Sequence, residues 1–295
     1  MVLKMSYISG CTMYIMKSMF LFALFLSILC VMFLLIHSVH PIYKDLQTPY
    51  PQLTTKWPID NLLLNLTQDD LELVGKLKSE VRPPPLGKYS FNRGEKPFKE
   101  HVLERAVRQF KLLGRGYFVE VGAGDGEKRS PTICLEIDDK WMGLLIEADL
   151  RFWKDLKSKR RKVTLGLSCV GLANSSYVGK FGLKDMSRSK LIDKWEVGLS
   201  ELMEVNCYPL YTYLLAVGRT EVDFLVININ GQELKVLQSL PWDKVTIHMI
   251  AVCYGMKRER VEASDYLSGK GYRLHRKYHQ EGESFLMFVK KNKYP

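Results

Sequence analysis

The stretch Tyr117-Phe118-Val119-Glu120-Val121-Gly122-Ala123-Gly124-Asp125-Gly126 decides the fold. Its first five residues indicate a buried parallel strand, and the glycines at every second position after it indicate a tight turn. Glycine accepts positive φ at no steric cost, and because it lacks a Cβ it lets a ligand approach the backbone. The spacing differs from the G-x-G-x-x-G pattern of dinucleotide sites, which hold a pyrophosphate.

A second carboxylate follows at a distance that suits a nucleoside. Glu147 ends the apolar run Gly143-Leu144-Leu145-Ile146, about 20 residues past the glycine turn, where Rossmann-type sites place the acid that grips ribose hydroxyls. A glycine-rich turn in an α/β protein without a ligand is the alternative. The turn and Glu147 together favour a nucleoside-type pocket.

The composition describes a basic globular chain. With 295 residues and 46% hydrophobic content, one or two domains with an ordinary core are expected. The net charge of +11 suits nucleic acid, an anionic membrane or simply a solvated surface. We favour the solvated surface and expect no nucleic-acid partner, because no nucleic-acid motif accompanies the charge. The basic run from Lys154 to Lys162 is likewise interpreted as a solvated helix end, with binding of acidic partners as the alternative.

The N-terminal region predicts a membrane anchor. After a short tail over residues 1–18, the run from Met19 to Ile36 carries no charge and is long enough to cross a ~30 Å hydrocarbon core. A cleaved signal peptide is disfavoured, because its apolar region is shorter and ends in small residues. We predict an uncleaved transmembrane helix over 19–39 with the lipid bilayer as its partner. Nearby lysines are equal in number on the two sides, so charge leaves the orientation open.

The rest of the chain divides into a stalk and a folded domain. Prolines recur through residues 40–95 and favour an extended, Pro-rich stalk. The domain is expected over 96–295, beginning with a helix over 98–113. Its predicted strands are 117–121, 143–147, 163–167, 222–227, 246–253, 271–275 and 285–290. Its predicted helices are 131–140, 150–159, 209–217, 232–239 and 259–269. This alternation indicates an α/β fold with a mainly parallel doubly wound sheet, and the short loop before the last strand indicates an antiparallel hairpin partner.

The glycine turn resembles the first motif of class I S-adenosylmethionine-dependent methyltransferases, whose ligand has an amine and a ribose but no phosphate. From about Gly116 to Lys291 the chain resembles the FkbM-type methyltransferase family and, within it, the insect Star proteins. The matching blocks include Phe118–Gly126, Trp141–Asp149, Arg160–Lys162, Cys207–Leu215, Gly218–Thr220, Val222–Leu225, Gly231–Leu237, Pro241–Val245 and Gly269–Tyr272.

This resemblance implies a Rossmann-like class I methyltransferase sheet, mostly parallel with an antiparallel last strand. It also implies an S-adenosylmethionine site, either functional or vestigial, built from Glu120, Gly122, Gly124, Gly126 and Glu147. No metal ligand is implied, and the absence of a C-x-x-C pair argues against zinc.

The Star resemblance implies a cellular role. It implies a single-pass type II membrane protein with a cytosolic N-terminus and a lumenal or extracellular domain, in the endoplasmic reticulum, Golgi, endosome or plasma membrane. It further implies an escort role for membrane-bound growth-factor precursors of the epidermal growth factor type in the secretory pathway.

One departure from the family weakens the case for catalysis. The family usually carries an Asp and a Glu after its fourth strand, and this chain has Asn228 and Asn230 there. An amide hydrogen-bonds but does not accept a proton as a carboxylate does. We therefore expect weak or absent methyl transfer. An active S-adenosylmethionine-dependent methyltransferase is the alternative.

The domain cysteines leave two possibilities open. Cys134, Cys169, Cys207 and Cys253 lie in the predicted domain. In an oxidising lumen a bridge between Cys169 and Cys207 is favoured, since both lie outside the predicted strand interiors. Four buried free thiols are the alternative.

Overall fold

The structure of the chain is a computed structural model that describes residues 19–34, 52–54, 63–94, 98–110, 115–183, 189–192 and 201–291. It divides into two compact units, Met1–Tyr50 and Pro51–Pro295. In the first unit, residues 19–34 form a helix. None of the helices in the described ranges is both long and apolar enough to cross a membrane. Residues 35–39 of the anchor expected over 19–39, and the tail 1–18, lie outside the described residues.

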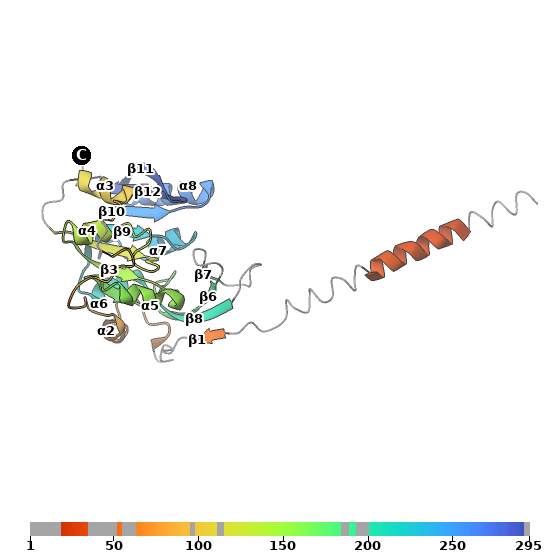
Figure 1. Cartoon of the computed structure of the whole chain (residues 1–295), viewed down its shortest axis with the longest axis horizontal. Coiled ribbons are helices and arrows are strands. Elements are labelled where there is room, and N and C mark those ends of the chain that lie inside the picture. The colour runs from red at the N-terminus through yellow and green to blue at the C-terminus, as the bar shows by residue number, and fades with distance from the viewer. Residues whose placement is uncertain are drawn as a thin grey trace, which may run out of the picture. The chain divides into compact units, whose positions relative to one another are not determined.

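A seven-stranded sheet forms the centre of the second unit (Figure 1). Its strands are β2 (Tyr117–Val121), β3 (Met142–Ile146), β4 (Thr164–Gly166), β9 (Glu221–Ile227), β10 (Thr246–Cys253), β11 (Tyr272–Gln280) and β12 (Glu283–Lys290). They lie in the order β11-β12-β10-β9-β2-β3-β4. The strands from β10 to β4 pair in parallel, and β12 runs antiparallel to both β10 and β11. This confirms the Rossmann-like methyltransferase sheet and its antiparallel last strand.

Helices cover both faces of this sheet, because its strands are apolar on both sides. One face packs against α2 (Leu71–Glu80), α6 (Leu210–Ala216), α7 (Glu233–Ser239) and α8 (Lys257–Gly269). The other packs against α3 (Val102–Gln109), α4 (Ile133–Ile137) and α5 (Leu150–Ser158). Neighbouring strand residues alternate between the two cores, as Phe118 and Val119 do on β2. This is the burial pattern of a doubly wound α/β sheet.

A second sheet was not predicted. It consists of β1 (Gln52–Thr54), β5 (Cys169–Val170), β6 (Tyr177–Leu183), β7 (Lys190–Leu191) and β8 (Glu201–Tyr208). The strand β8 lies between β6 and the parallel strand β1, and β5 also pairs with β8. These strands are short or interleaved with polar residues, so their apolar runs are too weak to be recognised in the sequence. A small core beneath them contains Phe181, Leu183 and Met203.

The expected disulfide is wrong in this structure. Cys169 and Cys207 are register partners on β5 and β8, so they are close together. Both are buried free thiols within strands, whereas we expected them outside the strand interiors. Burial, followed by the neighbouring Cys207, raises the pKa of Cys169 above its usual value. The alternative of buried free thiols describes this pair correctly.

The expected stalk is also wrong over residues 63–94. Asp70 caps α2 by accepting a hydrogen bond from the backbone N–H of Glu72 at 2.9 Å. Leu73 and Leu77 of this helix are fully buried in the main core. The backbone of Arg82 then pairs with that of Leu165 in β4. The prolines flank this helix without interrupting it, so the domain begins well before residue 96.

We predict that Leu73→Ala lowers the free energy of unfolding by about 2–5 kcal/mol, because it removes a fully buried side chain and leaves a cavity. Urea denaturation of the full chain measures the loss. The matched control is Lys78→Ala on the exposed face of α2, which should change it by less than about 0.5 kcal/mol. Equal effects of the two substitutions would show that α2 is not part of the core.

Candidate functional site

The glycine turn after β2 shapes the site. Gly122 has φ +84, and a Cβ there would lie 2.1 Å from the backbone oxygen of Asn228, so only glycine lets β2 and the end of β9 approach so closely. Gly126 has φ +72 and packs against the side chain of Leu156 in α5. Gly124 has φ +57, and a Cβ there would meet nothing within 4 Å. Gly122 and Gly126 thus pack closely against neighbouring groups, whereas Gly124 faces open space.

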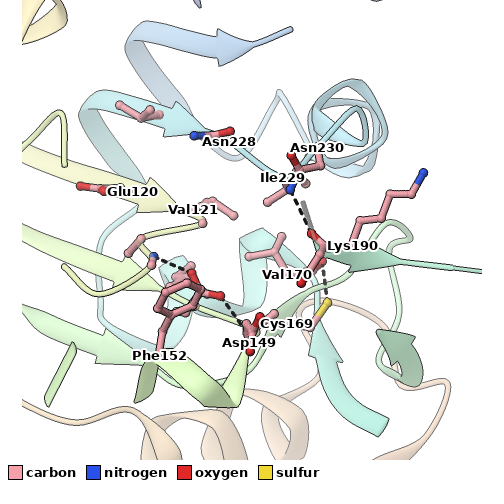
Figure 2. Close-up of a pocket in the computed structure, with 18 of the residues that line it drawn as sticks. Glu120, Val121, Asp149, Phe152, Cys169, Val170, Lys190, Asn228, Ile229 and Asn230 are labelled. Carbon is pink, nitrogen blue, oxygen red and sulfur yellow. Dashed lines mark hydrogen bonds between the residues drawn. The ribbon is translucent and has the colours of Figure 1, made fainter. Parts of the chain in front are cut away.

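That open space is a cavity of about 660 Å³ at the carboxyl edge of the large sheet (Figure 2). Its volume is within the range of small-molecule and cofactor sites. All five predicted positions except Gly126 line it: Glu120, Gly122, Gly124 and Glu147, with Asn228 and Asn230 beside them. Figure 2 shows Asn228 and Asn230 on one side and Asp149 and Phe152 on the opposite side. Phe181 and Leu191 of the unpredicted sheet also contribute to the wall.

Glu147 joins the glycine turn to the end of β3. Its Oε2 accepts a hydrogen bond from the N–H of Gly124 at 2.6 Å, and its Oε1 accepts one from the N–H of Asp149 at 2.7 Å. Burial raises the pKa of Glu147 to about 7, although these N–H donors oppose the rise. Near neutral pH this carboxyl therefore exists in both protonation states. In either state it can share a hydrogen bond with a hydroxyl in the cavity.

Glu120 takes part in a buried polar network. Its Oε2 accepts hydrogen bonds from Ser130 at 2.9 Å and Thr132 at 2.5 Å. Arg161 donates to the same two hydroxyls, and its Nε pairs with Glu136 at 2.6 Å. Burial raises the pKa of Glu120 to about 7, and the charge of Arg161 opposes the rise. Glu120 lines the cavity, but its contacts hold the loop after the glycine turn in place.

The basic run 154–162 is only in part the solvated helix end that we expected: Lys154, Lys157 and Arg160 are exposed, but two of its charges are buried. Lys159 and Arg161 are each only 1% exposed. The Nζ of Lys159 forms a salt bridge with Glu127 at 3.0 Å, and Arg161 reaches Glu136 of α4. The charged groups of Lys159 and Arg161 are therefore buried, and their ion pairs connect the segments around the site.

The two amides act as donors. The Nδ2 of Asn228 donates to Glu283 Oε1 at 3.3 Å, and the Nδ2 of Asn230 donates to the backbone oxygen of Ser189 at 3.0 Å. A carboxylate cannot donate either bond when ionised. Asn230 also holds φ +58, a conformation that asparagine tolerates better than most residues.

Sequence reasoning missed an ion pair that lines the cavity. The Nη1 of Arg129 lies 3.1 Å from Glu283 Oε1. Glu283 begins β12 directly after Glu281 and Gly282, which both have positive φ and form the two-residue turn from β11. An antiparallel β12 beside β10 places this turn at the carboxyl edge of the sheet. The turn was recognisable in the sequence; the contact of Glu283 with Asn228 required the register of the strands.

Comparisons with known proteins agree with this architecture. Residues 120–274, just over half of the chain, match the family model of the methyltransferase FkbM domain. No curated protein matches the chain.

Solved structures show weak similarity. The TrmK structure from M. capricolum with S-adenosyl-homocysteine has 14% identity and a TM-score of 0.37, covering 66% of this chain and 71% of that one. Precorrin-6y C5,15-methyltransferase from Geobacter metallireducens GS-15 has 12% identity and a TM-score of 0.39, covering 69% and 94%. The human methyltransferase 10 domain containing protein has 12% identity and a TM-score of 0.37, covering 63% and 78%. Similarity at this level indicates nothing about activity.

We predict that Gly122→Ala destabilises the domain clearly more than Gly124→Ala. The second change carries only left-handed strain, about 1–2 kcal/mol, whereas the first adds a collision with the Asn228 carbonyl. The free energies of unfolding of both variants, measured in urea, test this order. A smaller loss for Gly122→Ala would mean that β2 and β9 do not approach as described.

Proposed function

The chain belongs to the FkbM methyltransferase family, and from this premise we propose that its cavity binds S-adenosylmethionine. One observation carries the proposal: Glu147 and the open side of Gly124 meet at the wall of a cavity of suitable size. The site combines a carboxyl group, a glycine backbone without a Cβ and an apolar wall that includes Phe152 and Val170. These groups fit a ligand with ribose hydroxyls and a flat base.

Each group of residues would contact a different part of the ligand. Glu147, at the end of β3, would hold ribose hydroxyls by hydrogen bonds. Gly122 and Gly124 would let the ligand lie against the backbone of the turn, while Phe152 and Val170 would exclude water from the base. When bound, S-adenosylmethionine supplies a methyl group on a positively charged sulfur. Glu120 keeps the turn and the following loop in the shape that this binding needs.

We propose that transfer of this methyl group is weak. Asn228 and Asn230 stand at the positions of the family acids, and neither amide accepts a proton. Loss of a positioned base typically lowers a rate by ~10²–10⁴-fold. An active methyltransferase is the alternative, and it is favoured by Glu283, a carboxylate within hydrogen-bond distance of Asn228. Turnover of a labelled methyl group, before and after Asn228→Asp with Asn230→Glu, distinguishes the two.

We further propose a Star-like role: escorting membrane-bound growth-factor precursors through the secretory pathway. The support is the resemblance from about 116 to 291 together with the two amides, which favour a domain used for binding. The proposal includes the anchor over 19–39 in a lipid bilayer and a type II protein with its domain in the lumen or outside the cell. Its compartments would be the endoplasmic reticulum, Golgi, endosome or plasma membrane.

We predict that the full chain binds S-adenosylmethionine and S-adenosylhomocysteine in isothermal titration. Glu147→Ala should weaken both affinities by about 10- to 100-fold, because a hydrogen bond to a charged group contributes 1.5–3 kcal/mol. The matched control is Glu262→Ala, which removes an exposed carboxylate paired with Arg258 on α8 and should leave both affinities unchanged. If neither ligand binds the natural chain, the cofactor proposal fails.

We predict that co-expression of the full chain moves a membrane-tethered growth-factor precursor out of the endoplasmic reticulum. A chain that ends at residue 95 should not, because it lacks the large sheet. Microscopy of the tagged precursor measures the effect. An unchanged distribution across several such precursors would contradict the escort role and favour the enzyme.

A further inference from the structure

The ion pair between Arg129 and Glu283 joins two parts of the cavity that are remote in sequence. Arg129 lies in the loop after the glycine turn and holds φ +61, whereas Glu283 begins β12. Their side chains are 30% and 19% exposed, so both remain accessible from solvent. Opposite charges at the wall of a cavity can exchange their mutual contact for contacts with a ligand that carries both charges.

Asn228 fixes the position of this pair. Its Nδ2 donates to the same Glu283 Oε1 that contacts Arg129, so one carboxylate oxygen serves both neighbours. The cluster of Arg129, Asn228 and Glu283 therefore lies where the ends of β9 and β12 meet the loop. In the strand order, it is on the opposite side of β2 from Glu147.

We propose that Arg129 and Glu283 bind the amino-acid end of S-adenosylmethionine. Glu283 takes the ammonium group and Arg129 takes the carboxylate. The inference rests on the proposed cofactor, whose ribose Glu147 would hold across the glycine turn. The planar guanidinium suits a carboxylate, and an ammonium pairs well with a carboxylate oxygen. Asn228 keeps Glu283 in place through its amide and is a positioning residue.

Glu120 is less suited to this task, although its sequence position suggests it. Its carboxylate is 3% exposed and accepts hydrogen bonds from Ser130 and Thr132. Releasing it for a ligand would disturb the hydroxyls that also contact Arg161. Glu283 has no such burial and therefore meets a charged ligand at lower cost.

The test compares two ligands that differ at one end. S-adenosylhomocysteine carries the amino-acid group, and 5′-methylthioadenosine has the same nucleoside and sulfur without it. In titrations of the full chain, Glu283→Gln and Arg129→Gln should each lower the affinity for S-adenosylhomocysteine by about 10-fold or more. Neither substitution should change the affinity for 5′-methylthioadenosine by more than about 2-fold. Binding of the second ligand also shows that each variant is folded.

The control is Glu281→Gln, which makes the same chemical change in the exposed turn two residues away and should affect neither ligand. The inference is wrong if the variants at 129 and 283 bind S-adenosylhomocysteine as tightly as the natural chain does. It is also wrong if they lose affinity for both ligands equally. If the natural chain binds neither ligand, the proposed cofactor itself is wrong, so the two failures are distinguishable.

Discussion

The buried guanidinium of Arg161 holds the candidate site together. It contacts Glu136 on α4, the backbone oxygen of Gly126, and the hydroxyls of Ser130 and Thr132. Its carbon lies 5.8 Å from the ring centre of Phe118 on β2. Removing one partner of a buried charge network leaves other charges uncompensated, which costs about 3–5 kcal/mol. The glycine turn, the loop after it and the start of β4 therefore depend on one side chain.

The carboxylates around the cavity differ in their burial. Glu120 and Glu147 are buried, and burial raises the pKa of each to about 7. Because an unfolded glutamate ionises near 4.3, the folded chain binds more protons between these values, and stability falls as pH rises through this window. Glu283 is at the cavity wall, where its side chain is 19% exposed and lies 3.1 Å from Arg129. Of these acids, Glu147 and Glu283 line the cavity at the proposed ligand contacts, whereas the hydrogen bonds of Glu120 hold the loop after the glycine turn.

The sequence was sufficient where the signal is local. The strand at 117–121, the acid at 147 and the last hairpin follow from apolar runs, glycines and a short polar loop. The second sheet was not predictable, because β8 pairs with β1 about 150 residues away in the chain. Helix α2 was hidden by prolines on both sides. Arg161 was misinterpreted because a basic run is normally solvated, and its partners lie 25–35 residues earlier.

The neighbouring Glu283 gives a physical reason for an amide instead of an acid at position 228. The resemblance to the family places an acid there, and the structure places Glu283 Oε1 3.3 Å from the Asn228 amide nitrogen. Two carboxylates at this separation would repel each other, and one would be driven to hold a proton. An amide removes the repulsion and supplies a hydrogen-bond donor to Glu283. This edge of the sheet therefore carries a carboxylate at the start of β12, hydrogen-bonded to the amide at the end of β9.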